Sequence, residues 1–128
     1  MVIEKPRPCV CVVDDDDAVR DSLELFLSVK GLEVFTYAGG RQLLDNESCV
    51  LPKLFILDIH MPEMDGFELV TQLRQRGIDA PVIFMSGLGD RSIELRVVNF
   101  GVAAFFNKPI DPHALYQKMV QLIGQPIA

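Results

Sequence analysis

The stretch LFILDIHMPEMDG, residues 54–66, combines an apolar run with an acid at its end. The run 54–57 is typical of a strand that is buried on both faces of a parallel sheet. Asp58 follows it directly, before a turn that contains Pro62, so its carboxylate is presented at one point on a rigid support. A second apolar run, residues 9–13, ends in four aspartates at 14–17. Two strands therefore present carboxylates, and these side chains meet if the two strands lie side by side.

The rest of the chain alternates short apolar runs with amphipathic segments. Asp16 or Asp17 is expected to cap the first helix, and glycines stand where four of the helices end. Regular alternation of strand and helix predicts an α/β fold: a parallel sheet with right-handed crossovers and helices on both faces. The predicted strands cover residues 9–13, 33–37, 54–57, 81–85 and 103–106, and the predicted helices cover 17–30, 40–45, 67–76, 92–100 and 112–123.

The length of 128 residues and the hydrophobic content of 49% predict one domain over residues 1–128, with 124–128 as a tail or the start of a linker. The net charge of −6 argues against direct nucleic-acid binding by this domain, because such binding needs a basic face. No apolar run approaches the ~20 residues of a membrane span. Three cysteines without CxxC spacing, Cys9, Cys11 and Cys49, suit core packing in a reduced, cytoplasmic chain.

Four of the five predicted strands end in polar residues: Asp14 and Asp15, then Asp58, Ser86 and Lys108. In a parallel sheet the chain direction places all these ends on one edge, where ligands of such folds bind. Clustered carboxylates repel one another unless a cation lies between them, and oxygen ligands favour a hard ion such as Mg²⁺. A divalent ion, a lysine and a hydroxyl together suit phosphoryl transfer, with one carboxylate as the nucleophile.

Over nearly the whole chain, these residues resemble the receiver domain of two-component response regulators. The resemblance is carried by Val-Val-Asp-Asp-Asp at 12–16, Asp58 with Met61-Pro62 and Asp65-Gly66, Ser86-Gly87, and Lys108-Pro109. Each motif alone is weak, whereas the ordered set is specific. The resemblance implies a doubly wound, flavodoxin-like sheet of five strands in the order 2-1-3-4-5, flanked by five helices. Residues 86–90 are similar to receivers of transcription factors with a helix-turn-helix output domain.

The resemblance also implies roles for the polar residues at the strand ends. Asp58 would accept a phosphoryl group from the phosphohistidine of a sensor histidine kinase. Mg²⁺ would be held by Asp15 and Asp58 directly, by Asp14 through water, and by the backbone carbonyl of His60. Lys108 would pair with Asp58 at rest and with the phosphoryl group afterwards.

The residues of the expected switch follow from the same resemblance. Ser86 would donate a hydrogen bond to a phosphoryl oxygen, and Phe105 stands at the position of the family's rotating aromatic residue. The Lys108–Pro109 peptide bond would be cis. Leu88 and His60 are expected to flank the opening through which water attacks the phosphoryl group. Beyond its own phosphorylation and slow dephosphorylation, the domain is not expected to be an enzyme.

The readout would be a changed protein surface that controls either an output domain or a partner. The output domain is expected to regulate transcription. A stand-alone receiver or a phosphorelay intermediate is the alternative. The expected surface for a homodimer or an output domain spans the fourth helix, fifth strand and fifth helix. Leu95 and Val98 lie off the core stripe of the fourth helix, which suits either that surface or extra core burial.

Three rival functions fit the sequence less well. An aspartyl phosphatase needs a second Asp two positions after the nucleophile, where this chain has His60. A flavin or nucleotide module needs a phosphate-binding loop of small residues after the first strand, where an aspartate run would repel phosphate. A receiver that serves only for docking is expected to have lost its key residues, and all of them are present here.

Overall fold

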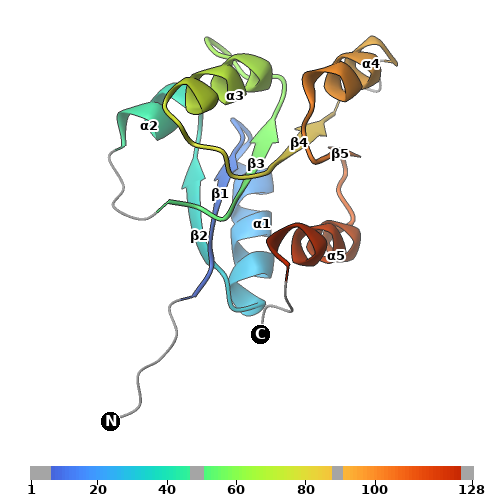
Figure 1. The fold of residues 1–128 in the computed structure, drawn as a ribbon. Helices are drawn as coiled ribbons and strands as arrows, with labels where there is room; N and C mark the ends of the chain where they lie inside the picture. The colour runs from blue at the N-terminus through green and yellow to red at the C-terminus, as the bar shows by residue number, and fades with distance from the viewer. Residues whose placement is uncertain (1–6, 47–50, 88–90, 125–128) are drawn as a thin grey trace.

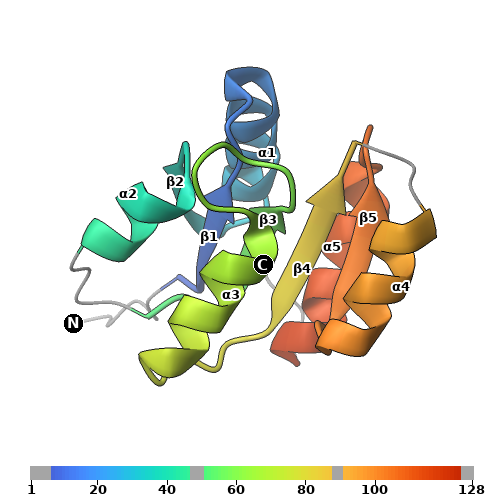
Figure 2. The same ribbon diagram turned by 90° about the horizontal axis from the view of Figure 1, so that it is seen from above.

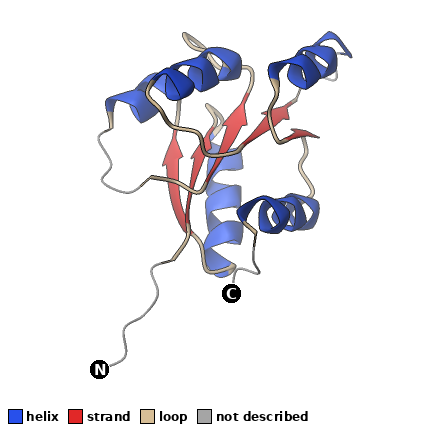
Figure 3. Ribbon diagram, in the orientation of Figure 1, coloured by secondary structure: helices blue, strands red, loops and turns tan. Residues whose placement is uncertain are grey.

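The computed structural model describes residues 7–46, 51–87 and 91–124. Its five strands and five helices alternate along the chain, as shown in Figure 1 and, coloured by secondary structure, in Figure 3. The strands are β1 (Cys9–Val13), β2 (Glu33–Tyr37), β3 (Leu54–Asp58), β4 (Val82–Ser86) and β5 (Ala104–Asn107). The helices are α1 (Asp17–Val29), α2 (Gly40–Asp45), α3 (Gly66–Gln75), α4 (Arg91–Phe100) and α5 (Pro112–Ile123).

All strand pairings are parallel, and the strand order is β2-β1-β3-β4-β5, which confirms the predicted topology. Chain order reverses at β1, because β2 lies on one side of it and β3 on the other. Ligands of open α/β sheets bind at such a reversal, outside the carboxyl ends of the strands. β1, β3 and β4 are buried along their whole length, as the continuous apolar runs predict.

The two faces of the sheet are covered by different helices (Figure 2). On one face, Val10, Val12 and Ile56 pack against α1 and α5 through side chains such as Leu27 and Met119. On the other face, the core residues come from α2, α3 and α4 and from the alternate positions of the strands. Alternation of side chains along each strand supplies both cores from the same sequence.

Most element boundaries agree with the sequence-based prediction to within one residue. Asp16 caps α1 and accepts hydrogen bonds from the backbone N–H groups of Ala18 and Val19, so Asp17 lies inside the first turn. β3 extends one residue further than predicted, and β4 and β5 both start and end one residue later. Backbone pairing of Asp58 with Met85 and of Ser86 with Asn107 sets these ends, which side-chain pattern alone does not record.

Candidate functional site

The polar residues predicted at the strand ends lie together on the carboxyl edge of the sheet. Asp14 follows β1, Asp58 is the last residue of β3, and Ser86 is the last residue of β4. Lys108 follows β5, and its backbone N–H donates to the carbonyl of Ser86 at 2.8 Å. Four adjacent strands therefore deliver these side chains to one place, as chain direction in the sheet predicts.

Three carboxylates form the centre of the site. One oxygen each from Asp14, Asp15 and Asp58 lie within 4.8 Å of one another. Asp14 is fully buried and Asp58 is 3% exposed, whereas Asp15 is exposed to solvent. Two charged groups removed from water in this way need a positive partner, because burial penalises the ionised form.

The Asp14 segment is held by contacts that the sequence analysis does not predict. The Asp14 backbone N–H donates to the carbonyl of Tyr37 at the end of β2, at 3.1 Å. The Arg20 guanidinium, one turn into α1, donates to the Asp14 carbonyl at 2.6 Å. The Asp16 N–H donates to Asp14 Oδ1 at 2.9 Å. These bonds fix the backbone and the side chain of Asp14. The one signal for them in the sequence is Arg20, which stands one helical turn after the capping residue Asp16.

Lys108 supplies the positive charge. Its Nζ lies 2.7 Å from Asp14 Oδ2 and 3.6 Å from Asp58 Oδ1. The predicted pairing of Lys108 with Asp58 is thus present, but the closer partner is Asp14. One ammonium group bridges two buried carboxylates and partly offsets their mutual repulsion.

The pKa values of the charged groups reflect this arrangement. Burial, reinforced by the negative charge of Asp14, raises the pKa of Asp58 from 3.8 to about 6, although Lys108 acts in the opposite direction. Burial by itself lowers the pKa of Lys108, but the contact with Asp14 and the charge of Asp58 outweigh it, so this pKa lies above its ordinary value of 10.5. A cation bound beside Asp58 would favour the ionised carboxylate and lower this pKa.

The other described residues of the prediction lie in, or shortly after, the same strands. Ser86 is fully buried at the end of β4, and Phe105 is half-buried on β5, where it pairs in register with Phe84. His60 is exposed, two positions after Asp58. The Lys108–Pro109 bond is cis, as predicted. Leu88, expected to flank the path of attacking water, lies outside the described residues.

The carboxylate cluster fits a hard divalent cation. Within residues 7–46, 51–87 and 91–124, Asp14 Oδ2 and Asp58 Oδ1 are the buried side-chain oxygens that lack a well-directed hydrogen bond, even though Lys108 Nζ is near both. An ion between them would satisfy both oxygens. The donor set is made only of carboxylate oxygens, which favours a metal such as Mg²⁺ over zinc or copper.

Comparison with known proteins agrees with the fold. Residues 10–120 match the family model described as the response regulator receiver domain. The chain belongs to the response regulator receiver domain family. The receiver domain is 34% identical, over 116 residues, to the transcriptional regulatory protein FixJ of Azorhizobium caulinodans, covering 91% of this chain and 55% of that protein. It is 37% identical to the C4-dicarboxylate transport transcriptional regulatory protein DctD of Pseudomonas aeruginosa, covering 83% of this chain and 23% of that protein.

Solved structures show the same receiver fold. The structure titled FixJ-N superimposes with a TM-score of 0.82 at 26% identity, covering 97% of this chain and 99% of the other. The response regulator StyR gives a TM-score of 0.82 at 32% identity, covering 93% and 60%. This receiver domain spans about half the length of FixJ and less than a quarter of DctD. None of its described helices is long and apolar enough to cross a membrane.

Proposed function

We propose that Asp58 is the phosphoacceptor of a two-component response regulator. The observation that carries the proposal is the cluster itself: three carboxylates within 4.8 Å and Lys108 beside them, at the reversal point of a receiver fold. The donor is the phosphohistidine of a sensor histidine kinase. A carboxylate oxygen of Asp58 attacks phosphorus, the phosphorus–nitrogen bond breaks, and the histidine ring retains the electron pair of that bond.

The chain's own residues position and neutralise the transferred group. Lys108, which contacts Asp14 and Asp58, lies where it can pair with the phosphoryl oxygens. Ser86 at the end of β4 donates its hydroxyl hydrogen to one of them. The carboxylates of Asp14, Asp15 and Asp58 and the backbone carbonyl of His60 would hold Mg²⁺, with Asp14 acting through water. When bound, the ion supplies positive charge against that of the phosphoryl oxygens.

The proposed output is a changed surface rather than a released product. The receiver family is not a classical enzyme family; we propose that this domain catalyses only its own phosphorylation and slow dephosphorylation. Ser86 and Phe105 are the proposed switch residues. Ser86 would donate to the phosphoryl group, and Phe105 packs against the core cluster that contains Phe84 of β4. Several relatives are named as transcriptional regulators, which favours an output domain that controls transcription.

The proposed partner surface spans α4, β5 and α5. Leu95 and Val98 on α4 are 60% and 77% exposed, so the alternative of extra core burial is wrong. Exposed large apolar residues on one helix suit contact with a second copy or an output domain. We propose no direct nucleic-acid contact by this domain, consistent with its net charge of −6. The buried free thiols of Cys9 and Cys11 suit the reducing cytoplasm.

Replacement of the proposed phosphoacceptor tests the function directly. Asp58→Asn keeps the size of the side chain but removes the nucleophilic carboxylate, so incubation with Mg²⁺ and acetyl phosphate should add no phosphoryl group. Intact-protein mass spectrometry measures the incorporation. Asp21→Asn, at an exposed position of α1, is the matched control and should be phosphorylated like the unaltered protein. Undiminished incorporation in Asp58→Asn would falsify the assignment.

A further inference from the structure

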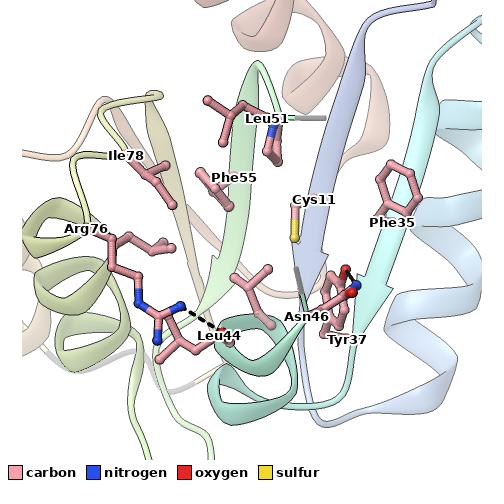
Figure 4. A pocket seen from close by; sticks show the side chains of 12 residues that line it. Cys11, Phe35, Tyr37, Leu44, Asn46, Leu51, Phe55, Arg76 and Ile78 are labelled. Atoms are coloured by element: carbon pink, nitrogen blue, oxygen red, sulfur yellow. Dashed lines mark hydrogen bonds between the residues drawn. The ribbon is translucent and has the colours of Figure 1, made fainter. Parts of the chain in front are cut away.

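A hollow lies away from the carboxylates, between α2, the end of α3 and the sheet (Figure 4). It has a volume of about 90 Å³. Its inner wall is apolar and includes Cys11 of β1, Leu44 of α2 and Phe55 of β3, all buried. The metal and phosphoryl chemistry proposed above uses none of these side chains.

Polar groups also line the hollow. They include the Tyr37 hydroxyl, the Asn46 amide and the Arg76 guanidinium, and Asn46 Nδ2 donates to the Tyr37 hydroxyl. Arg76 and Asn46 are exposed, so this side of the hollow is open to solvent. Arg76 Nη1 donates to the Leu44 carbonyl at 2.7 Å, which holds the guanidinium at the rim (Figure 4).

The charge of the lining is one-sided. Burial, followed by the charge of Cys9, raises the pKa of the Cys11 thiol far above its ordinary value of 9.0, so this group is a neutral thiol in the wall. Arg76 is the one residue in the described lining that carries a full charge. An apolar floor with a single guanidinium at the mouth complements an apolar molecule with one anionic end.

We infer that this hollow binds a small carboxylate with a branched-chain or single-ring apolar body. An engineered apolar cavity of about 150 Å³ binds benzene. The present hollow is smaller but open to solvent on its polar side, so part of the apolar body would enter it and the carboxylate would remain outside, near Arg76. The neutral thiol contributes packing and no covalent bond.

The hollow is joined to the phosphorylation site through the backbone. Tyr37 lines the hollow, and its carbonyl accepts the hydrogen bond from the Asp14 N–H. A ligand that contacts Tyr37 therefore disturbs the acid segment as well. Binding is expected to shift the backbone amide resonance of Asp14 together with those of Cys11, Leu44 and Phe55.

The test is a titration of the ¹⁵N-labelled chain with benzoate, followed by amide NMR without phosphodonor or metal. Saturable shifts at these four amides, with a dissociation constant on the order of 1 mM, are expected for so small a ligand. Arg76→Gln should weaken benzoate binding about tenfold and leave the binding of benzyl alcohol, its neutral analogue, unchanged. Arg41→Gln, at an exposed position of α2 outside the lining, is the control and should bind both like the unaltered chain.

Two variants test whether the ligand lies inside the hollow. Cys11→Met should fill the hollow from its inner wall. If that variant does not fold, Leu43→Phe, at a half-buried lining position, is expected to fill the hollow instead. Either folded variant should lose binding of both probes. Non-saturable or scattered shifts, or undiminished binding in the filled variants, would overturn the inference. Because no step depends on Asp58 or on metal, this result is independent of the phosphoryl-transfer proposal.

Discussion

Asp58 is held in an environment that disfavours its own charge. It is 3% exposed, and burial together with the charge of Asp14 raises its pKa to about 6. Lys108 lies 3.6 Å from Asp58 Oδ1 but 2.7 Å from Asp14 Oδ2, so it neutralises Asp14 more closely than Asp58. One lysine does not neutralise both carboxylates, so negative charge remains at the site. A phosphoacceptor site that binds Mg²⁺ requires such charge.

The raised pKa predicts a pH-dependent gain in stability for Asp58→Asn. Below about pH 4 the carboxyl group is protonated in both folded and unfolded chains, so its charge costs nothing. As pH rises from about 4 to about 6 the unfolded chain ionises more readily, and the folded state loses relative stability. Asp58→Asn avoids this cost. The free energy of unfolding of the variant should therefore exceed that of the unaltered chain by about 1–3 kcal/mol at pH 7 and by almost nothing at pH 4.

Urea unfolding in the presence of a chelator measures this difference. Addition of Mg²⁺ should stabilise the unaltered chain, because an ion that binds the folded state alone shifts the equilibrium towards it. The difference in free energy of unfolding between the two chains at pH 7 should therefore become smaller. A difference in free energy of unfolding that stays constant between pH 4 and pH 7 would contradict a raised pKa for Asp58.

At the scale of elements, the connection from β3 to α3 places Asp58 by close backbone packing. Gly66, the first residue of α3, donates its N–H to the Ile59 carbonyl at 2.9 Å. A Cβ atom added at Gly66 would lie 2.8 Å from the Asp58 backbone oxygen, 3.0 Å from Ile59 Cα and 3.1 Å from a ring carbon of Phe84. The start of α3 therefore contacts the strand end that carries Asp58, with no space for a side chain.

Gly66→Ala should consequently destabilise the fold. The clashing atoms belong largely to the backbone and cannot rotate away, so a cost of about 1–3 kcal/mol is expected for this overpacking. Gly87→Ala is the matched control, because among the described residues its added Cβ would meet only Lys108 Cδ, at 3.8 Å. Urea unfolding of both variants gives the comparison, and equal stabilities for the two would refute close packing at Gly66.

At the scale of the whole molecule, two of the described helices, on opposite faces of the sheet, carry exposed large apolar side chains. Leu95 and Val98 lie on α4, and Leu25 and Val29 lie on α1, at 69% and 76% exposure. Only the α4 pair belongs to the proposed surface of α4, β5 and α5. The two pairs have the same chemistry and spacing close to one helical turn, so one can serve as the control for the other.

The double variant Leu95→Asp, Val98→Asp should abolish any self-association that phosphorylation induces, because charges on the contact helix oppose burial of that face. Sedimentation velocity with and without acetyl phosphate measures the change. Leu25→Asp, Val29→Asp on α1 should leave association intact. Loss of association in the α1 variant but not in the α4 variant would place the interface on the other face.

The sequence by itself determined the parallel α/β fold and the residues gathered at its carboxyl edge. Continuous apolar runs, each followed by an acid, a serine or a lysine, place these side chains on one edge because all strands of a parallel sheet point the same way. Only the tertiary structure decided that Lys108 lies closer to Asp14 than to Asp58, and that Tyr37 and Arg20 hold the Asp14 backbone. These contacts depend on the lateral spacing of strands distant in the chain and on side-chain direction, which local periodicity does not encode.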